Sequence, residues 1–159
     1  MSGAGTFDDV RDLYQQVILD HGRHPRNHRR LERPDGRADG DNPMCGDRIA
    51  VEVRRGPAGE LEDIGFQARG CAICIASGSL MSELCRGRGA AEVHALAAAV
   101  RTLARTGQAP PATGWMAEAL DRLAPLSGVA AFPSRVKCAT LAWHTLEAAM
   151  AGGGKVSTE

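Results

Sequence analysis

The fold is decided by residues 48–69, which read RIAVEVRRGPAGELEDIGFQAR. In the first six positions every second residue is apolar and branched: Ile49, Val51 and Val53. Side chains alternate between the two faces of a strand, so this pattern predicts a strand with one buried face. Residues 56–59, Gly-Pro-Ala-Gly, are typical of a turn, and residues 60–69 form the returning strand. The stretch therefore predicts an antiparallel hairpin whose two ends lie side by side.

The ends of this hairpin carry residues with metal-binding chemistry. Upstream lies the turn Asn42-Pro43-Met44-Cys45-Gly46-Asp47, in which proline fixes one backbone dihedral and glycine frees another. Cys45 and Asp47 are two residues apart and can point to the same side of the chain. Downstream, the hairpin ends directly at Gly70-Cys71. Because the two ends meet, Cys71 is expected to return near Cys45.

Helices are predicted on both sides of the hairpin, where apolar residues recur at helical spacing. The expected ranges are 7–21 before the hairpin, and 72–86, 90–105, 115–123 and 135–150 after it. Residues 24–41 and 125–133 are expected to be loops, and no strand is expected after Ala90. The combination predicts an α+β fold: an N-terminal helix, a small antiparallel β-sheet built on the hairpin 48–69, and several C-terminal helices packed on one face.

The length and charge balance of the chain limit its possible functions. The 159 residues suffice for a single domain spanning 1–159, with flexible ends expected at about 1–6 and 152–159. Lys plus Arg and Asp plus Glu number 19 each, and this balance argues against nucleic-acid or membrane-surface binding, which normally needs a basic excess. No apolar stretch has the length of a membrane span, and no signal peptide is visible, so the expected location is cytoplasmic with reduced thiols.

The five cysteines are an odd number, which does not suit a complete disulfide framework. Grouped cysteines in a reducing compartment more often indicate metal or sulfur chemistry. Cys45, Asp47, Cys71 and Cys138 would supply three thiolates and one carboxylate, a tetrahedral set suited to zinc. Cys138 falls near the start of the last predicted helix, where its pKa is expected to be depressed. The alternative is that these cysteines are scattered small buried residues.

Other candidates are weaker. Cys71 and Cys74 form a C-x-x-C pair, which alone suggests a redox dithiol or half of a zinc site, but no thioredoxin-like βαβ pattern surrounds it. Cys74 and Cys85 are expected to be small core residues. Three histidines cluster around the end of the first helix and could be ligands, although exposed loop histidines are the simpler interpretation: His21, His24 and His28.

Several motifs occur together along the chain: Leu13-Tyr14 to Asn27, Asn42-Pro43-Met44-Cys45-Gly46-Asp47, Gly70-Cys71-Ala72-Ile73, and Phe132-Pro133 to Ala139. In this order they resemble the U-type (IscU/NifU N-terminal-like) iron–sulfur cluster assembly family, from about residue 13 to residue 150. The resemblance implies that Cys45, Asp47, Cys71 and Cys138 are the metal ligands.

Within that family the chain is similar to the SufU branch. Lys137 stands where the true scaffolds have a histidine, and extra residues occur around 107–123. The branch implies a tightly held Zn²⁺ and a sulfurtransferase that accepts persulfide sulfur from a SufS-type cysteine desulfurase and serves downstream iron–sulfur assembly proteins. Cys45 would be the acceptor, freed when a desulfurase histidine takes its place on the zinc, with Cys138 as the alternative acceptor.

Some alternatives stay open at this point. The chain could instead be a scaffold that assembles a [2Fe–2S] cluster or binds iron, or a structural zinc module. Cys74 departs from the family pattern and leaves open a second acceptor thiol beside the site. Arg135 and Lys137 could tune a thiolate electrostatically or could be solvated charges at a helix start.

Overall fold

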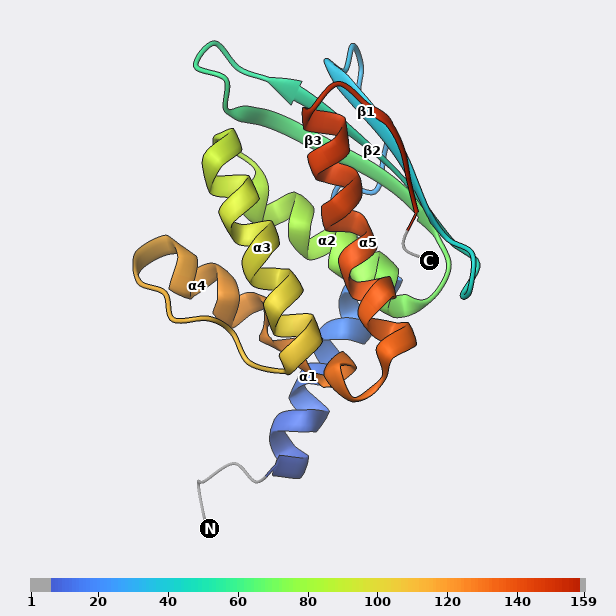
Figure 1. Ribbon diagram of the computed structural model, residues 1–159, viewed down its shortest axis with the longest axis vertical. Coiled ribbons are helices and arrows are strands. Elements are labelled where there is room, and N and C mark those ends of the chain that lie inside the picture. Colours follow the sequence, from blue (N-terminus) through green and yellow to red (C-terminus); the bar gives the residue numbers. More distant parts are fainter. Residues whose placement is uncertain (1–6, 158–159) are drawn as a thin grey trace.

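The structure, a computed structural model, describes residues 7–157, and the side chains from Val10 onward. Figure 1 shows helices gathered on one side of a twisted sheet. The elements in chain order are α1 (Phe7–Arg23), β1 (Gly36–Asn42), β2 (Asp47–Arg55), β3 (Leu61–Arg69), α2 (Ala72–Cys85), α3 (Ala90–Thr106), α4 (Gly114–Leu123), the 3₁₀ helix η1 (Ala124–Ala131), α5 (Pro133–Met150) and β4 (Gly154–Ser157).

The sheet has four strands in the order β3-β2-β1-β4. Strands β1, β2 and β3 pair antiparallel, and β4 runs parallel to β1. Helix α5 packs on β1 and β2, and α2 packs on both β3 and α5. The α+β fold expected from the sequence is confirmed.

The hairpin forms as an antiparallel pair, as predicted. Across β2 and β3 the pairs are Ile49 with Ala68, Val51 with Phe66, and Val53 with Ile64. All six side chains are buried, and Trp143 of α5 lies fully buried in the same core. The apolar face of the hairpin is therefore the floor on which the helices pack.

The expectation of a loop over residues 24–41 is wrong for its last part, which forms β1. The inward-facing positions of β1 include Gly36 and Gly40. A β-carbon at Gly36 would collide with the Ala149 carbonyl, and one at Gly40 with the Thr145 hydroxyl. Because β1 lies this close to α5, it needs residues that favour turns in other settings.

The tail also differs from expectation. The prediction that no strand follows Ala90 is wrong, because residues 154–157, expected to be disordered, form β4. Gly152, Gly153 and Gly154 all have positive φ values and turn the chain from α5 back to the sheet. The expected loop over 125–133 is mostly the 3₁₀ helix η1. Residues 1–6 and 158–159 lie outside the described residues.

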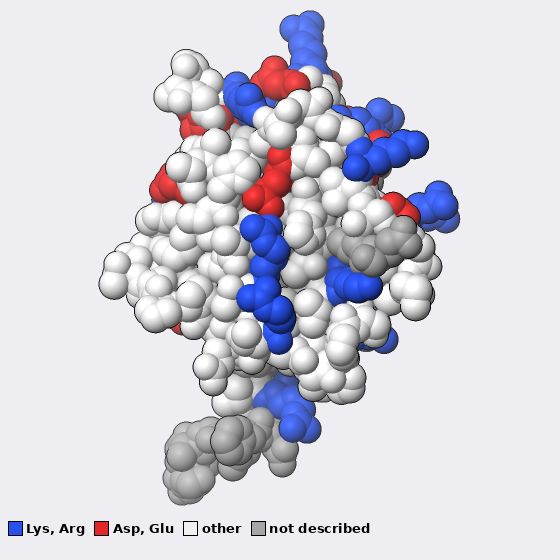
Figure 2. All heavy atoms as spheres, in the orientation of Figure 1, with Lys and Arg blue, Asp and Glu red and all other residues white. Residues whose placement is uncertain are grey.

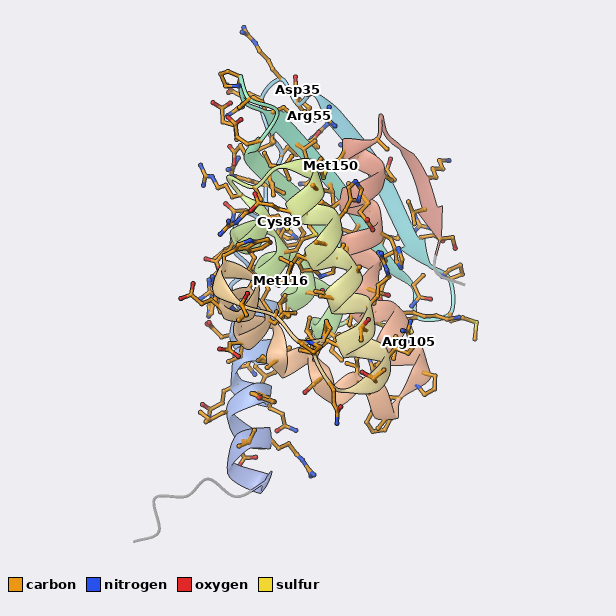
Figure 3. The ribbon with its side chains drawn as sticks, turned by 60° about the vertical axis from the view of Figure 1, so that its left-hand side comes forward. Asp35, Arg55, Cys85, Arg105, Met116 and Met150 are labelled. Carbon is orange, nitrogen blue, oxygen red and sulfur yellow. The ribbon has the colours of Figure 1, made fainter. Side chains whose placement is uncertain are left out.

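The surface has no single dominant charge on the face that Figure 2 shows, where basic and acidic side chains are interspersed with uncharged surface. Figure 3 shows Arg55 beside Met150, and the Arg55 guanidinium donates to the Met150 carbonyl, which joins the end of β2 to the end of α5. None of the helices in the described part of the chain has the length and apolar character that crossing a membrane requires.

Candidate metal centre

The turn between β1 and β2 presents Cys45. Asn42 and Asp47 are the last register pair of these strands, and residues 43–46 connect them. The Asn42 carbonyl accepts the backbone N–H groups of Cys45 at 3.2 Å and Gly46 at 2.8 Å. Gly46 has φ +74°, in the left-handed region that glycine adopts without steric cost. The turn is therefore closed by backbone hydrogen bonds while the Cys45 side chain stays exposed.

Asp47 links this turn to the start of α2. Its carboxylate is fully buried, and Oδ1 accepts the backbone N–H of Cys71 at 2.9 Å. Oδ2 lies 3.8 Å from the Cys71 sulfur. The preceding residue, Gly70, has φ +141°, and a β-carbon there would collide with the Asp47 carboxylate. Gly70 thus leaves the space that Asp47 occupies.

Helix α5 brings the fourth residue. The Ser134 carbonyl lies 3.6 Å from the Cys138 sulfur and 4.0 Å from the Cys45 sulfur. One potential ligand atom each from Cys45, Asp47 and Cys138 lies within 4.8 Å of the others. Cys71 lies outside this group of three, and its sulfur is 3.8 Å from Asp47 Oδ2, so the structure places the fourth candidate beside the group.

The expected pKa depression at Cys138 is wrong for the protein without metal. Burial raises the pKa of this thiol, and its hydrogen bond with Asp47 raises it further. Helix α5 begins at Pro133, so Cys138 lies in the second turn, away from the N–H groups that would favour a thiolate. Three sulfurs around a buried carboxylate suit a divalent cation, which offsets their charges, and three sulfurs with one oxygen are a donor set that zinc accepts.

Arg135 is the charged residue at the rim of this cluster. Its pKa is raised, first by the charge of the Cys71 sulfur and then by that of Cys138. The guanidinium is exposed, and the position places a permanent positive charge beside the sulfurs.

The remaining cysteines are buried in the core, as predicted. Cys74 and Cys85 are both fully buried, and Figure 3 shows Cys85 among the helices. Burial raises the pKa of both thiols, that of Cys85 to about 12. A thiol that stays protonated and inaccessible is a poor nucleophile.

The histidines near α1 have structural contacts. His21 is buried, not exposed as expected, and its Nδ1 lies 2.7 Å from the Ser79 hydroxyl. His28 Nε2 accepts the Ala68 N–H at 3.0 Å, and its ring packs edge-on against Phe66. These contacts hold the segment after α1 against α2 and β3, and the group of possible metal-ligand atoms in the described part of the chain includes no histidine.

One residue of the site was missed from the sequence. The Asn42 side chain is fully buried, and its Nδ2 lies 3.8 Å from the Cys138 sulfur. The signal would have been a polar residue at the inward-facing end of β1, but β1 itself was expected to be a loop.

Gly70→Ala tests the space around Asp47. The new methyl group collides with the carboxylate at a strained φ, so we expect the free energy of unfolding to fall by about 2 kcal/mol. Zinc binding should weaken at least tenfold, measured by chelator competition. Gly59→Ala is the matched control, because Gly59 has φ +85° and open space around it. Equal zinc affinities of the two variants would contradict this account of Gly70.

A small α+β domain that gathers three thiols and a buried carboxylate at one end of its sheet has the form of a cysteine-rich metal or sulfur carrier. Residues 13–152 match the family of NifU-like N-terminal domains. The chain belongs to this family of iron–sulfur cluster assembly scaffolds.

Individual relatives support the same conclusion. The chain is 38% identical over 141 residues to the iron–sulfur cluster assembly scaffold protein IscU of Streptococcus pyogenes, covering 89% of this chain and 84% of the relative. It is 34% identical over 139 residues to the zinc-dependent sulfurtransferase SufU of Bacillus subtilis, covering 87% and 90%. A crystal structure of an iron–sulfur cluster assembly scaffold protein for the SUF system from Fervidobacterium islandicum matches with a TM-score of 0.76 and 26% identity, covering 88% and 98%.

Proposed function

We propose that this protein is a zinc-dependent sulfurtransferase of iron–sulfur cluster biogenesis, which accepts persulfide sulfur from a SufS-type cysteine desulfurase in the cytoplasm. The whole chain acts as one U-type domain, with Cys45, Asp47, Cys71 and Cys138 as the zinc ligands. The observation that carries the proposal is the unequal exposure of the thiols. Cys45 is exposed on a turn, Cys71 is half-buried, and Cys74, Cys85 and Cys138 are buried.

The four proposed ligands have different roles in this proposal. When bound, zinc would keep the coordinating sulfurs deprotonated near neutral pH. Asp47, Cys71 and Cys138 stay in place because they lie on, or at the ends of, regular elements. Cys45 can move with its turn, so it is the sulfur that reaches a partner. Arg135 offers a positive charge beside the sulfurs as the negative persulfide approaches.

The transfer balances without a further reagent. The Cys45 thiolate attacks the terminal sulfur of a cysteine persulfide on the desulfurase. A new S–S bond forms on Cys45, the S–S bond of the donor breaks, and the donor cysteine leaves as a thiolate. The persulfide now on Cys45 is the form in which sulfur would pass to downstream assembly proteins.

The surface around the site supports docking of such a partner. The exposed large apolar residues in the described part of the chain come from α1, the Cys45 turn and the start of α5: Val10, Leu13, Leu19, Met44 and Phe132. A groove of about 1210 Å³ between α1 and η1 is lined by Cys71 and Arg135. Apolar surface of this kind beside a reactive thiol suits a protein partner that encloses the transfer. The proposal includes no nucleic-acid and no membrane partner.

A second candidate is a scaffold on which a [2Fe–2S] cluster is assembled and then handed on. The observation that favours it is the 38% identity to a relative named as a scaffold. The cluster would be cargo held by the same four residues, and Lys137 beside Cys138 would replace the histidine of the true scaffolds.

Metal analysis of the freshly purified protein, combined with a desulfurase assay, tests the proposal. The expected result is about one zinc per chain, no iron or labile sulfide, and stimulation of a SufS-type cysteine desulfurase. A coloured [2Fe–2S] species without stimulation favours the scaffold. If the protein contains zinc but does not stimulate the desulfurase, the zinc has only a structural role.

Asp47 variants test the hard ligand. Asp47→Cys makes an all-thiolate site, so we expect zinc affinity to rise at least tenfold and persulfide uptake to slow. Asp47→Ala loses a ligand and also leaves the half-buried Cys71 N–H without its acceptor, so zinc affinity should fall. Chelator competition gives the affinities. The control is Asp39→Ala, an exposed carboxylate on the same sheet, which should leave both properties unchanged.

A further inference from the structure

Strand β1 packs along α5 through its inward-facing residues. Its inward-facing Gly36 and Gly40 leave room for Ala149 and Thr145, respectively. The helix residues that meet the strand fall from Ala149 to Thr145 as the strand residues rise from Gly36 to Gly40, so β1 runs along α5 in the opposite direction. The next inward-facing position, Asn42, comes to rest over the N-terminal part of α5, where Cys138 lies.

The Asn42 side-chain amide donates a hydrogen bond to the sulfur of Cys138. The side chain is fully buried, and its one hydrogen bond among the described residues is donated by Nδ2 to the Cys138 sulfur at 3.8 Å. Its Oδ1 is buried and has no partner in the described part of the chain. A buried amide with a free oxygen costs stability that an apolar residue of the same shape would avoid. Such a cost at one position is typical of a functional site.

The three sulfurs of the cluster therefore have different neighbours. Cys138 faces the amide donor of Asn42, and Cys71 shares a groove wall with the guanidinium of Arg135. The Ser134 carbonyl, an acceptor, lies near both other sulfurs, 3.6 Å from Cys138 and 4.0 Å from Cys45, and so does not distinguish them. What distinguishes them in the described part of the chain is the Asn42 N–H donor, which bonds to the Cys138 sulfur. Hydrogen bonds donated to a thiolate draw electron density from sulfur and lower its nucleophilicity.

We propose that Asn42 is a positioning residue: its amide fixes Cys138 as a permanent thiolate ligand, so that ligand exchange and persulfide formation are confined to Cys45. The inference rests on the proposed function, because it needs metal-bound thiolates. In this inference, the residue that determines which thiolate reacts is Asn42, which lies beside the metal ligands without being one of them. Replacing the Asn42 side chain should leave the turn that carries Cys45 intact, because the hydrogen bonds that close this turn are accepted by the Asn42 backbone carbonyl.

The order in which the cysteines react tests this inference. The zinc-loaded protein is treated with a limiting amount of iodoacetamide, and each cysteine is followed by peptide mass spectrometry. In the wild-type protein Cys45 should react first and Cys138 at least tenfold more slowly. In Asn42→Leu and Asn42→Ala we expect Cys138 to react at least fivefold faster than in the wild type, with Cys45 unchanged.

Thr145→Val is the matched control. Thr145 packs on the same strand at Gly40, and within residues 7–157 its hydroxyl bonds only to the Leu141 carbonyl of its own helix, at 2.7 Å. This variant disturbs the contact between β1 and α5 without touching the sulfur, so the wild-type order should persist. Cobalt-substituted protein gives a second readout, because losing the N–H donor should move the sulfur-to-cobalt charge-transfer band to lower energy in the Asn42 variants alone.

A measurement on the wild-type protein covers the case in which neither Asn42 variant folds. With ¹¹³Cd in place of zinc and ¹⁵N labelling, a scalar coupling between cadmium and the Asn42 side-chain amide protons is expected across the hydrogen bond. An unchanged Cys138 rate in folded Asn42 variants, or no such coupling where the variants do not fold, overturns the inference and leaves the proposed function intact. A wild-type protein that binds neither zinc nor cadmium refutes both.

Discussion

Replacing Cys45 with serine is expected to abolish persulfide capture. The hydroxyl of serine is a far weaker nucleophile than a thiolate at neutral pH, so the attacking group itself is lost. The remaining residues of the site, Asp47, Cys71 and Cys138, are held by their own elements and keep their positions. Some zinc can therefore remain bound while transfer falls by at least a hundredfold.

Mass spectrometry after turnover with a cysteine desulfurase and cysteine measures this effect as a mass increase of one sulfur atom. Cys74→Ser is the matched control, because it removes a thiol that is fully buried behind the site and should still acquire the adduct on Cys45. The control also tests whether Cys74 is a second acceptor. If Cys45→Ser still gains sulfur and stimulates the desulfurase normally, then Cys45 is not the acceptor and Cys138 becomes the next candidate.

Removing zinc is expected to lower the melting temperature by about 10 °C. A metal present at about a thousand times its dissociation constant adds about 4 kcal/mol to the free energy of unfolding. For a chain of this length, 1 kcal/mol corresponds to about 2–4 °C. Without the cation, the buried Asp47 carboxylate lies among sulfurs with no positive ion to offset its charge.

Differential scanning calorimetry before and after chelation gives the shift, and adding zinc back should restore the original value. The matched comparison is the Gly70→Ala variant, whose smaller zinc affinity predicts a smaller shift on chelation. Equal melting temperatures with and without the chelator would count against a native metal site.

The sequence predicted the parts of the fold whose local pattern agrees with their environment. The hairpin is one such part, since Ile49, Val51 and Val53 have both strand propensity and a buried face. The gathering of Cys45, Asp47 and Cys71 followed from hairpin geometry, because antiparallel strands return to their starting edge. Cys138 joined the predicted set through its residue type and its place near a helix start, and the family resemblance strengthened this prediction, since nothing local fixes where a distant helix packs.

Other parts could not be predicted, because tertiary contacts overrode the local signal. Strand β1 has no β-branched residue, and its glycines serve close packing on α5. The glycine run before β4 resembled a disordered tail but forms a turn. The pKa of Cys138 depended on burial and on Asp47, which outweighed its place in the helix. The role of Asn42 could not be predicted, because its contact with Cys138 exists only once β1 and α5 are packed together.

The proposed ligands of the site are spread over more than half of the 159-residue chain, from the turn at Cys45 to the second turn of α5 at Cys138. During folding, an early hairpin intermediate would offer Cys45, Asp47 and Cys71, but the last sulfur arrives only after a loop of 66 residues, from Cys71 to Cys138, has closed. Contacts of such long sequence separation form late, because the entropy of loop closure must first be overcome. Capture of zinc at full affinity would then mark the completion of folding, and a chain stalled before α5 docks would hold the ion only loosely and release it to competing chelators.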